Sequence, residues 1–520
     1  MSKKEDLENS IKALFELWVE EKNKEKLQKI RYAGPAFGKE EYTNIMDSIF
    51  SDWWSGGKYS FKAEEKLAEY SQRNSALLTN SGSSANLLLM GGATFLIGCI
   101  PSYETIGFLA PTLVLILRLL QGLALGGEYG GAATYVAEHA GPGQRGYWTS
   151  WIQTTATIGL FVSLMVIMAT KSAMSKEAFE DWGWRVPFWV SILMILVSYL
   201  IRKNMSESPE FAKVKAEGKT SKNPLKESFG NKLNFKFVLL ALFGIVMGQG
   251  VVWYTGQFYA MSFIEKVMGL SDQVGDIMMY AILMATPFFV FFGWISDKIG
   301  RKWLMLAGIL IAVVAYRPIY RAMYETTSIK NKTEIEAKTV VLAETKENKA
   351  KALDSVYTTT KEFTDGATWK EVKTVTLENG VAKIGDDGKP KVEVKKTMVV
   401  NESDKWTLVW LVFIQIFLVT VVYGPTAAFL VELFPAKIRY TSMSLPYHIG
   451  NGIFGGLLPA VATSLVAAAT KANDAATEAG QAVAVAEPYL QGLWYPIIIG
   501  AICFIIGAIY VDGKSTSHKH

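Results

Sequence analysis

Two ionisable side chains, Arg118 and Glu128, lie within one long apolar stretch of the sequence, residues 108–137. A charge at membrane depth is costly unless it has a partner, faces water or, for a carboxylate, carries a proton. Arginine does not readily release its proton, whereas a carboxylate can bind and release one. Glycines on both sides of Glu128, between residues 126 and 131, leave space beside it. The pair therefore predicts a site that couples proton movement to another process.

Each of these two residues also has a structural alternative. Glu128 can bond to a loop near a helix end, and Arg118 can extend its charged head toward the membrane surface. The alternative is weaker for Arg118, because the residues on both sides of it are apolar. We therefore keep both residues as candidates for proton coupling.

Both residues need a membrane-spanning frame. About 20 apolar residues cross a bilayer core of roughly 30 Å, because a helix rises about 1.5 Å per residue. The chain has 520 residues, of which 50% are hydrophobic, and its polar residues are concentrated in 1–85 and 326–405. Ten apolar segments lie at 87–106, 108–137, 147–170, 186–202, 236–264, 274–296, 303–324, 406–433, 442–468 and 490–511. The pattern predicts an all-α polytopic membrane protein.

Basic residues predict how the spans are oriented. The loops at 202–235, 297–302 and 434–441 are rich in lysine or arginine and alternate consistently to one side of the membrane. Loops with such an excess of positive charge lie in the cytoplasm. The segments 171–185 and 326–405 are then expected to face outward.

The outward segment 326–405 contains strand-like stretches. Valine and threonine are frequent at 371–377 and 391–400, and turn signals occur at Asn379-Gly380 and at 386–388. We interpret the segment as a small β-rich extracytoplasmic insert. A disordered loop is the alternative.

One loop between two apolar segments has a specific spacing, G-x-x-x-D-[RK]-x-G-[RK]-[RK]. Its glycines allow close packing and a turn, its aspartate can cap a helix, and its basic residues can pair with acidic helix ends. Positive charge on the cytoplasmic side would explain the basic residues but not the spacing. The pattern resembles the loop signature of the major facilitator superfamily of membrane transporters. The residues that carry it are Gly293, Asp297, Gly300, Arg301 and Lys302.

Four further motifs, in order along the chain, resemble the metabolite:proton symporter branch of this superfamily. They are RLLQGLALGGEYGGA at 118–132, WRVPF at 184–188, ESPEF at 207–211 and ELFPAKIRYT at 432–441. The resemblance starts near Leu87 and covers helices three to twelve of that family. It implies a secondary transporter of a small carboxylate, zwitterion or compatible solute in a bacterial inner membrane, with protons as the coupled partner.

The resemblance also implies roles for particular residues. Arg118 and Glu128 would couple protons, and the signature loop with Glu432 and Arg439 would close the cytoplasmic side. Substrate sites lie near the midplane between the two halves of such transporters. Polar or aromatic residues at that depth are candidates for the cavity, although each alone is more often a helix–helix hydrogen bond. These candidates are Tyr254, Gln257, Tyr259, Tyr423, His448 and Asn451.

Residues 1–90 resemble a different family, the pyridoxal-phosphate-dependent sugar aminotransferases and dehydrases. The matching stretches are IRYAGPAFGKEEY at 30–42 and LTNSGSSANL at 78–87. In that family the second stretch opens a helix whose N-terminal amides hold the cofactor phosphate. Here the turn would be a vestige, because the rest of the fold is missing. The residues of this vestigial turn are Ser81, Gly82, Ser83 and Ser84.

The two resemblances meet where the transporter should have its first two helices and its first signature loop. We therefore expect a helical bundle of the major facilitator type that lacks those two helices. The remaining third helix, 86–100, is short, and we expect it to begin within the 81–85 turn with a distorted start. The soluble fragment before it should contain helices near 7–29 and 39–50.

These observations define four regions. A truncated aminotransferase-like cytoplasmic fragment occupies 1–86, and helices three to six of the transporter occupy 87–202. A central cytoplasmic loop follows at 203–235, and the second bundle with its insert occupies 236–520.

The predicted function is proton-coupled symport, impaired by the missing helices. The alternatives are a nucleotide-sugar enzyme that uses pyridoxal phosphate and a non-functional chimera. We expect no enzyme activity, resident cofactor, metal or nucleic-acid partner. The sequence has no phosphate loop of an ATPase.

Overall fold

The computed structural model describes residues 58–72, 82–126, 128–141, 143–203, 223–347, 353–378, 381–384 and 392–511, together with the isolated positions Ala13, Leu17, Lys213 and Glu217. The chain divides into two compact units, Met1–Ala85 and Asn86–His520. In the first unit, α3 (Lys58–Tyr70) was not anticipated from the sequence. The helices expected at 7–29 and 39–50 lie outside the described residues, apart from Ala13 and Leu17, which are helical.

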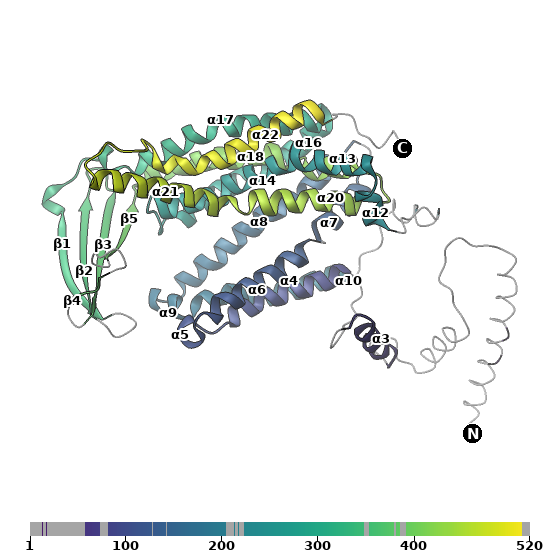
Figure 1. Ribbon diagram of the computed structural model, residues 1–520, viewed down its shortest axis with the longest axis horizontal. Helices are drawn as coiled ribbons and strands as arrows, with labels where there is room; N and C mark the ends of the chain where they lie inside the picture. Colours follow the sequence, from purple (N-terminus) through teal and green to yellow (C-terminus); the bar gives the residue numbers. More distant parts are fainter. Residues whose placement is uncertain are drawn as a thin grey trace, which may run out of the picture. The chain divides into compact units, whose positions relative to one another are not determined.

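The second unit begins with the helices of the first half of the bundle (Figure 1). We use "first half" for residues 82–203. Its apolar helices coincide with four of the segments predicted from the sequence. Five helices cover these four segments, because α6 and α7 share one of them. The five are α4 (Gly82–Cys99), α6 (Leu109–Leu125), α7 (Glu128–His139), α8 (Arg145–Ser172) and α10 (Val186–Lys203), joined by the short α5 (Tyr103–Ile106), α9 (Lys176–Asp181) and η1 (Gly183–Arg185).

The second half, residues 223–511, contains six spans. The first is α12 (Pro224–Phe229) followed by a helix with π-helical turns, namely α13 (Lys232–Ala241), η2 (Leu242–Val246), α14 (Met247–Tyr254), η3 (Thr255–Tyr259), α15 (Ala260–Ser262) and η4 (Phe263–Val267). The others are α16 (Val274–Ile299), α17 (Arg301–Thr327), α18 (Glu402–Tyr423) with α19 (Thr426–Leu433), α20 (Arg439–Ile449) with η7 (Gly450–Gly455) and α21 (Leu458–Glu478), and η8 (Pro488–Leu493) with α22 (Trp494–Tyr510). Two short 3-10 turns, η5 (Ile329–Asn331) and η6 (Glu336–Lys338), lead into the insert.

Among the described residues, nine helices are long and apolar enough to cross a membrane, and the shorter apolar helix Asn86–Cys99 is a tenth apolar segment. The sequence therefore located all ten. The expected distorted start of the third helix is wrong for the part of the chain that is described: α4 is continuous from Gly82 to Cys99. Its polar first turn continues the helix that the apolar residues form, because nothing between Gly82 and Cys99 breaks it.

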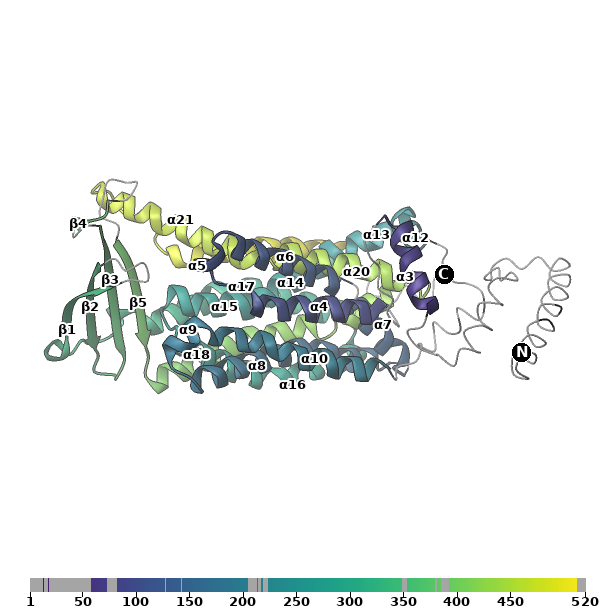
Figure 2. The same cartoon turned by 90° about the horizontal axis from the view of Figure 1, so that it is seen from below.

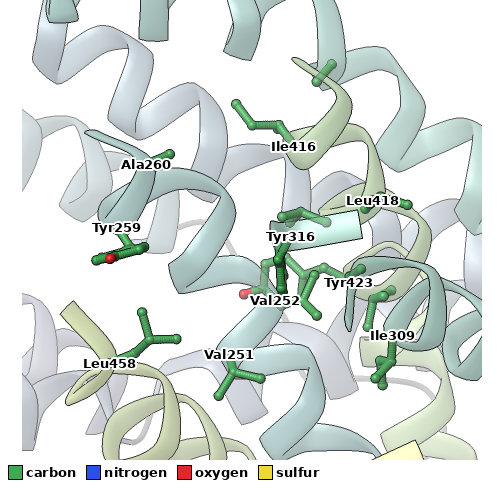
Figure 3. Close-up of a cluster of buried hydrophobic side chains, with 14 of the residues drawn as sticks. Val251, Val252, Tyr259, Ala260, Ile309, Tyr316, Ile416, Leu418, Tyr423 and Leu458 are labelled. Carbon is green, nitrogen blue, oxygen red and sulfur yellow. The ribbon is translucent and has the colours of Figure 1, made fainter. Parts of the chain in front are cut away.

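The two halves differ in how much of their apolar surface is buried. In the span 232–267, 67% of the most apolar stretch is buried, against 11% in 109–139 and 6% in 183–200. The hydrophobic core therefore lies in the second half. Figure 3 shows Val252 of α14, Tyr316 of α17 and Tyr423 of α18 packed together in it.

The insert is a five-stranded antiparallel sheet, drawn beyond one end of the helices (Figure 2). The stretches predicted as strands, 371–377 and 391–400, form β3 and β5, while β1 and β2 were not anticipated. The predicted turns at 379–380 and 386–388 lie outside the described residues. The strands are β1 (Val340–Glu347), β2 (Leu353–Glu362), β3 (Thr368–Glu378), β4 (Val381–Ala382) and β5 (Val392–Val399).

The register places Tyr357 of β2 between Ala343 of β1 and Lys373 of β3, and Lys373 also pairs with Val394 of β5. β4 pairs with the far end of β3. The sheet is thus a β-rich element rather than a disordered loop.

Hydrogen bonds fasten the sheet to the second half. The Met398 amide donates to the Gly269 carbonyl at 2.8 Å, and Gln273 bonds both the amide and the carbonyl of Val400. The Lys332 ammonium, almost fully buried, donates to Asp365 of the insert and to Asp404 at the start of α18.

We expect Lys332→Met to loosen this attachment. Hydrogen bonds to charged groups contribute about 1.5–3 kcal/mol each, so exchange of the Met398 amide should accelerate tenfold or more. Hydrogen–deuterium exchange of the full chain in nanodiscs measures this. Lys338→Met is the matched control, because Lys338 and its partner Glu362 are exposed and such pairs contribute little. Equal effects of the two substitutions would contradict the assignment.

The same attachment should be sensitive to acid. Burial alone would raise the pKa of Asp365, but the hydrogen bond and charge of Lys332 outweigh it and hold that pKa below its usual value. A depressed carboxyl pKa contributes stability above the unfolded value of about 3.9, and that stability is lost as the pH falls through the folded value. We therefore expect protection of the Met398 amide to be constant from neutral pH to about pH 5 and to fall below about pH 4. Protection that falls between pH 7 and 5 would point to another group.

Candidate functional site

Asp297, in the last turn of α16, caps a helix of the other half. Its two carboxylate oxygens accept the backbone N–H groups of Gly146 and Tyr147, each at 2.8 Å. These amides belong to the first turn of α8, where the residue preceding the helix, Gln144, makes no side-chain cap. A carboxylate at this position satisfies exposed amides and the positive end of the helix. Asp297 therefore joins the second half to the first.

Arg301, at the start of α17, holds the loop in place. Its Nε and Nη2 donate to the two oxygens of Glu432 at 2.7 and 2.6 Å, and Nη2 lies 3.0 Å from Asp297. Such two-pronged pairs are stronger and more directional than single ion pairs. Gly300 between them has φ +90°, a conformation that favours glycine. Lys302 takes a different role, since it donates to the Ala508 carbonyl near the end of α22.

A second contact between the halves is a buried ion pair. Arg439, at the start of α20, donates through Nη1 to Glu138 of α7 at 2.6 Å, with 5% and 2% of the two side chains exposed. Its Nε also donates to the Phe434 carbonyl. Sequence analysis expected a role for Arg439 but missed Glu138. We call Glu138, Asp297, Arg301, Glu432 and Arg439 the gate cluster.

An internal repeat could have revealed Glu138. Glu138 and Arg145 are seven residues apart in the sequence, and so are Glu432 and Arg439. Aligned on these pairs without a gap, the two stretches also match at Gln121 and Gln415, Tyr129 and Tyr423, and Gly130 and Gly424. The span 109–139 thus corresponds to the span 402–433, and 145–172 corresponds to 439–478. We call 109–139 and 145–172 the fourth and fifth spans, after the helices of the family that they resemble.

The repeat-related tyrosines meet where the halves touch. The rings of Tyr129 and Tyr447 stack with centroids 3.4 Å apart. Tyr129 accepts a hydrogen bond from Gln153, and Tyr423 shares one with Tyr447. Gln153 and Tyr447 occupy corresponding positions of the repeat, so the two bonds are related by the same symmetry. Of these four residues, sequence analysis had selected Tyr423 alone.

Close backbone contact explains a signature glycine. A Cβ on Gly293 would collide with the side chain of Ser150 and lie 2.6 Å from the Gly146 carbonyl oxygen. A Cβ on Gly146 would collide with the Gly293 carbonyl in turn. The two glycines therefore let α8 and α16 approach each other beside the Asp297 cap.

We expect Gly293→Ala to destabilise the bundle by about 1–3 kcal/mol, the usual cost of overpacking. Thermal unfolding in detergent measures the effect. Gly159→Ala is the matched control on α8, because nothing lies within 4 Å of its added carbon and alanine favours a helix. A loss of stability in the control equal to that in Gly293→Ala would show that the contact does not limit the packing.

The cavity candidates lie in different surroundings. Asn451 exchanges two hydrogen bonds with Gln249 and donates to the Tyr447 carbonyl, which places it beside the tyrosine cluster with Tyr423. Tyr259 instead packs in the core against Tyr320. Tyr254 is half-buried, against the Trp253 ring.

Gln257 is the candidate with the clearest signal for a ligand. It is 1% exposed, and neither polar atom of its side chain has a hydrogen-bond partner among the described residues. A buried amide without partners costs about 1–3 kcal/mol. Gln257 lies in the π-helical turn η3, and such turns are frequent at functional sites.

The two proton-coupling candidates lie on separate helices, α6 and α7. Glu128 is half-buried in the first turn of α7, where a carboxylate is favoured by the helix dipole. Arg118 is exposed on α6 and donates to Gln121 at 3.2 Å, while Gln121 donates to Thr94 of α4. Arg118 therefore lies on an exposed face of α6, with Gln121 as its hydrogen-bond partner.

His448 contacts the other half of the bundle. Its Nδ1 lies 2.7 Å from the Ser444 carbonyl and its Nε2 lies 3.2 Å from the Leu125 carbonyl. It therefore lies at the end of α6 rather than with the other cavity candidates.

Comparison with known proteins shows which family the helices around this site resemble. Residues 75–322 match the Major Facilitator Superfamily. The helical part of the chain is therefore similar to this superfamily. The chain is 26% identical to a citrate-proton symporter of Klebsiella pneumoniae over 74% of its own length and 69% of that protein. It is 32% identical to an alpha-ketoglutarate permease of Escherichia coli over 47% of its own length and 55% of the permease.

A solved structure shares the superfamily fold. The proton:xylose symporter XylE superposes with a TM-score of 0.51, over 92% of this chain and 90% of that one, at 14% identity. At this identity the likeness concerns the fold alone. The superposition includes both halves of the bundle.

Residues 35–98 match the DegT/DnrJ/EryC1/StrS aminotransferase family. This match overlaps the superfamily match at 75–98, which includes α4. Of the vestigial turn, Gly82, Ser83 and Ser84 form the start of α4, and Ser81 lies outside the described residues. A Cβ at Gly91 or Gly98 would collide with side chains of α10, so α4 serves here as a packed helix of the bundle.

The described residues include no group of three or more His, Cys, Asp or Glu side chains that could hold a metal ion.

Proposed function

We propose that the chain is a secondary active transporter that couples the movement of a small organic metabolite to protons by alternating access. The observation that carries this proposal is the gate cluster. Two of its contacts, Asp297 to the start of α8 and Arg439 to Glu138, join opposite halves at one end of the bundle. Charged contacts of this kind can break and re-form as the halves rock, whereas a continuous apolar interface could not release so readily.

The substrate is a small carboxylate, zwitterion or compatible solute. Relatives named for citrate and alpha-ketoglutarate support the carboxylate. A proline/betaine transporter of Escherichia coli, 30% identical over 48% of its length, supports a zwitterion. Gln257 supplies a buried donor and acceptor for such a ligand. Tyr254 lies on the same span as Gln257, and Asn451 lies on the span 439–478.

Protons are carried by Glu128, with Arg118 as the fixed charge that influences it. Both residues are on the fourth span, and the break between α6 and α7 separates them. Discontinuous spans commonly form coupling sites, because their exposed helix ends interact with ions. The repeat places Val412 and Val422 at the corresponding positions of the second half, which supports a specific role for the charged pair.

The protein lies in a bacterial inner membrane. The gate cluster and the loops at 202–235 and 434–441 are on the cytoplasmic side, with residues 1–86, and the sheet of 326–405 is outside. The excess of positive charge in those loops supports this orientation. The sheet lies beyond the end of the helices opposite α12 (Figure 1), and α12 packs against α20, which begins at Arg439 of the gate cluster.

Transport is impaired because two helices are missing. The repeat aligns 109–139 and 145–172 with 402–433 and 439–478. Taken in chain order, 82–99 and 183–200 then correspond to 301–327 and 488–510, which leaves 232–267 and 274–299 without a counterpart among the described residues of the first half. Arg118 and Gln121 are then left on a face that those counterparts would cover. We propose that the chain binds and exchanges its substrate but accumulates it poorly.

Proteoliposomes test this proposal with labelled citrate, proline and 2-oxoglutarate. We expect substrate exchange without a gradient, and little accumulation under an imposed proton gradient. Glu128→Gln should abolish what accumulation remains, whereas Glu177→Gln, an exposed residue of α9, should not. No exchange with any of the three would refute transport, and full accumulation that depends on Glu128 would refute the impairment.

The second candidate is a pyridoxal-phosphate enzyme, favoured by the match at 35–98. The fit is poor, because the helix that should hold the cofactor phosphate is packed on α10 as part of the bundle. We therefore propose no enzyme activity and no resident cofactor. Absorbance of an internal aldimine after addition of pyridoxal phosphate to the purified chain would overturn this.

A further inference from the structure

The two ring nitrogens of His448 both face carbonyl oxygens. Nδ1 is 2.7 Å from the Ser444 oxygen, one turn earlier on α20, and Nε2 is 3.2 Å from the Leu125 oxygen on the first half. A carbonyl oxygen can only accept a hydrogen bond, so each nitrogen must carry a hydrogen. Neutral imidazole carries one, and the imidazolium cation carries two. The arrangement is therefore complete only when the ring is protonated.

The acceptor on the first half is itself suited to a cation. Leu125 is the last residue of α6, and the final carbonyls of a helix form the negative end of its dipole. A protonated histidine at a helix C-terminus is a favourable pairing. Glu128, the carboxylate that begins α7, follows three residues later and adds negative charge on the same segment.

We propose that His448 is a proton-binding latch between the two halves of the bundle, at the break in the fourth span. A proton from water adds to Nε2 of the neutral ring, whose Nδ1–H already bonds Ser444, and the new N–H bonds the Leu125 carbonyl. Loss of that proton to water removes the bond between the halves. The latch adds a second proton site to the proposed symport. Only its role in transport rests on the proposed function, since the geometry of His448 is independent of it.

Other charged groups near α20 are mostly committed elsewhere. On its own helix, Arg439 pairs with Glu138, and Tyr447 contacts the His448 ring edge-on. The elements packed against α20, together with α6, contribute the following titratable or charged residues: Arg118 on α6; Glu128, Tyr129, Tyr135, Glu138 and His139 on α7; Lys226 and Glu227 on α12; Lys232 and Lys236 on α13; Glu432 on α19; and Tyr440 on α20 itself. Glu432 pairs with Arg301, and Glu227 pairs with Lys437.

His139 provides a matched control. Its Nδ1 makes the same bond one turn back, to the Tyr135 carbonyl at 2.7 Å. Its ring is exposed, on α7 of the first half. A substitution at His139 should therefore leave the latch intact.

Pulsed electron paramagnetic resonance on the full chain in nanodiscs tests the proposal. Spin labels at the exposed positions Gln144 and Lys437 report the separation of the halves, with the exposed Cys99 replaced by serine and the buried Cys503 retained. Between pH 5 and 9, we expect the ratio of the short-distance to the long-distance population to fall about tenfold as the pH rises, as befits a histidine cation at a helix end. His448→Gln should remove this dependence, and His139→Gln should preserve it. The same dependence in His448→Gln would overturn the proposal.

A second measurement keeps the proposal testable if the variant does not fold. Nitrogen-15 spectra of histidine-labelled wild-type protein should show an imidazolium signal that follows the short-distance population. A neutral ring throughout that population would overturn the latch. Neither measurement needs substrate. If the distances titrate through His448 but proteoliposomes show no exchange, the proposed transport fails while the latch stands.

Discussion

Arg439→Met is expected to destabilise the bundle by about 3–5 kcal/mol, the usual result of removing one partner of a buried ion pair. Glu138, with 2% of its side chain exposed, would lose the guanidinium of Arg439 while staying in a water-poor environment. Arg439 also bonds the Phe434 carbonyl, so the turn between α19 and α20 should loosen as well. Unfolding in mixed detergent micelles, followed by tryptophan fluorescence, measures the loss.

A nearby lysine gives the control for this experiment. Lys437 pairs with Glu227 at 3.2 Å, but half of its side chain is exposed, so Lys437→Met should cost less than about 1 kcal/mol. The double variant Glu138→Gln with Arg439→Met should be more stable than Arg439→Met alone, because no buried charge then remains from this pair. If the Arg439 and Lys437 variants lose the same stability, the buried contact between the halves contributes no more than an exposed ion pair.

Arg301→Ala is expected to cost about 3 kcal/mol, because its two charge-assisted hydrogen bonds to Glu432 are lost together. The substitution also leaves the carboxylates of Glu432 and Asp297 near each other without the guanidinium that both contact. Arg301→Lys should recover only part of the loss, because an ammonium group cannot form the two parallel bonds. The same unfolding assay ranks the three proteins.

Lys298 is the control in the signature loop. Its ammonium lies 3.7 Å from the centre of the Trp294 ring, an exposed contact worth about 0.5–1 kcal/mol. Lys298→Ala should therefore have a small effect. If Arg301→Lys has wild-type stability, a positive charge alone is enough at this position and the geometry of the pair is not needed.

Local sequence was sufficient to locate the spans and to select Asp297 and Arg301 of the gate cluster. Each apolar segment is identified by its own composition, and Asp297 and Arg301 are identified by the spacing of a single loop. The strands β3 and β5 were recognised from valine and threonine, but β1 and β2 were not, although β2 also contains both residue types. Glu138 could have been found from the repeat that it shares with Glu432, a signal that appears only when distant stretches are aligned.

The sequence by itself determined that this chain is a polytopic helical protein with a polar N-terminal segment, an insert and a signature loop, because hydrophobicity and turn chemistry act over a few residues. Only the tertiary structure decided which groups meet. The partners Arg439 and Glu138 are separated by 301 residues, and His448 reaches a carbonyl 323 residues away. Such contacts depend on how helices pack, which no local pattern encodes. For the same reason the exposure of Arg118 on α6, whose role the motif suggested, became visible only in the tertiary structure.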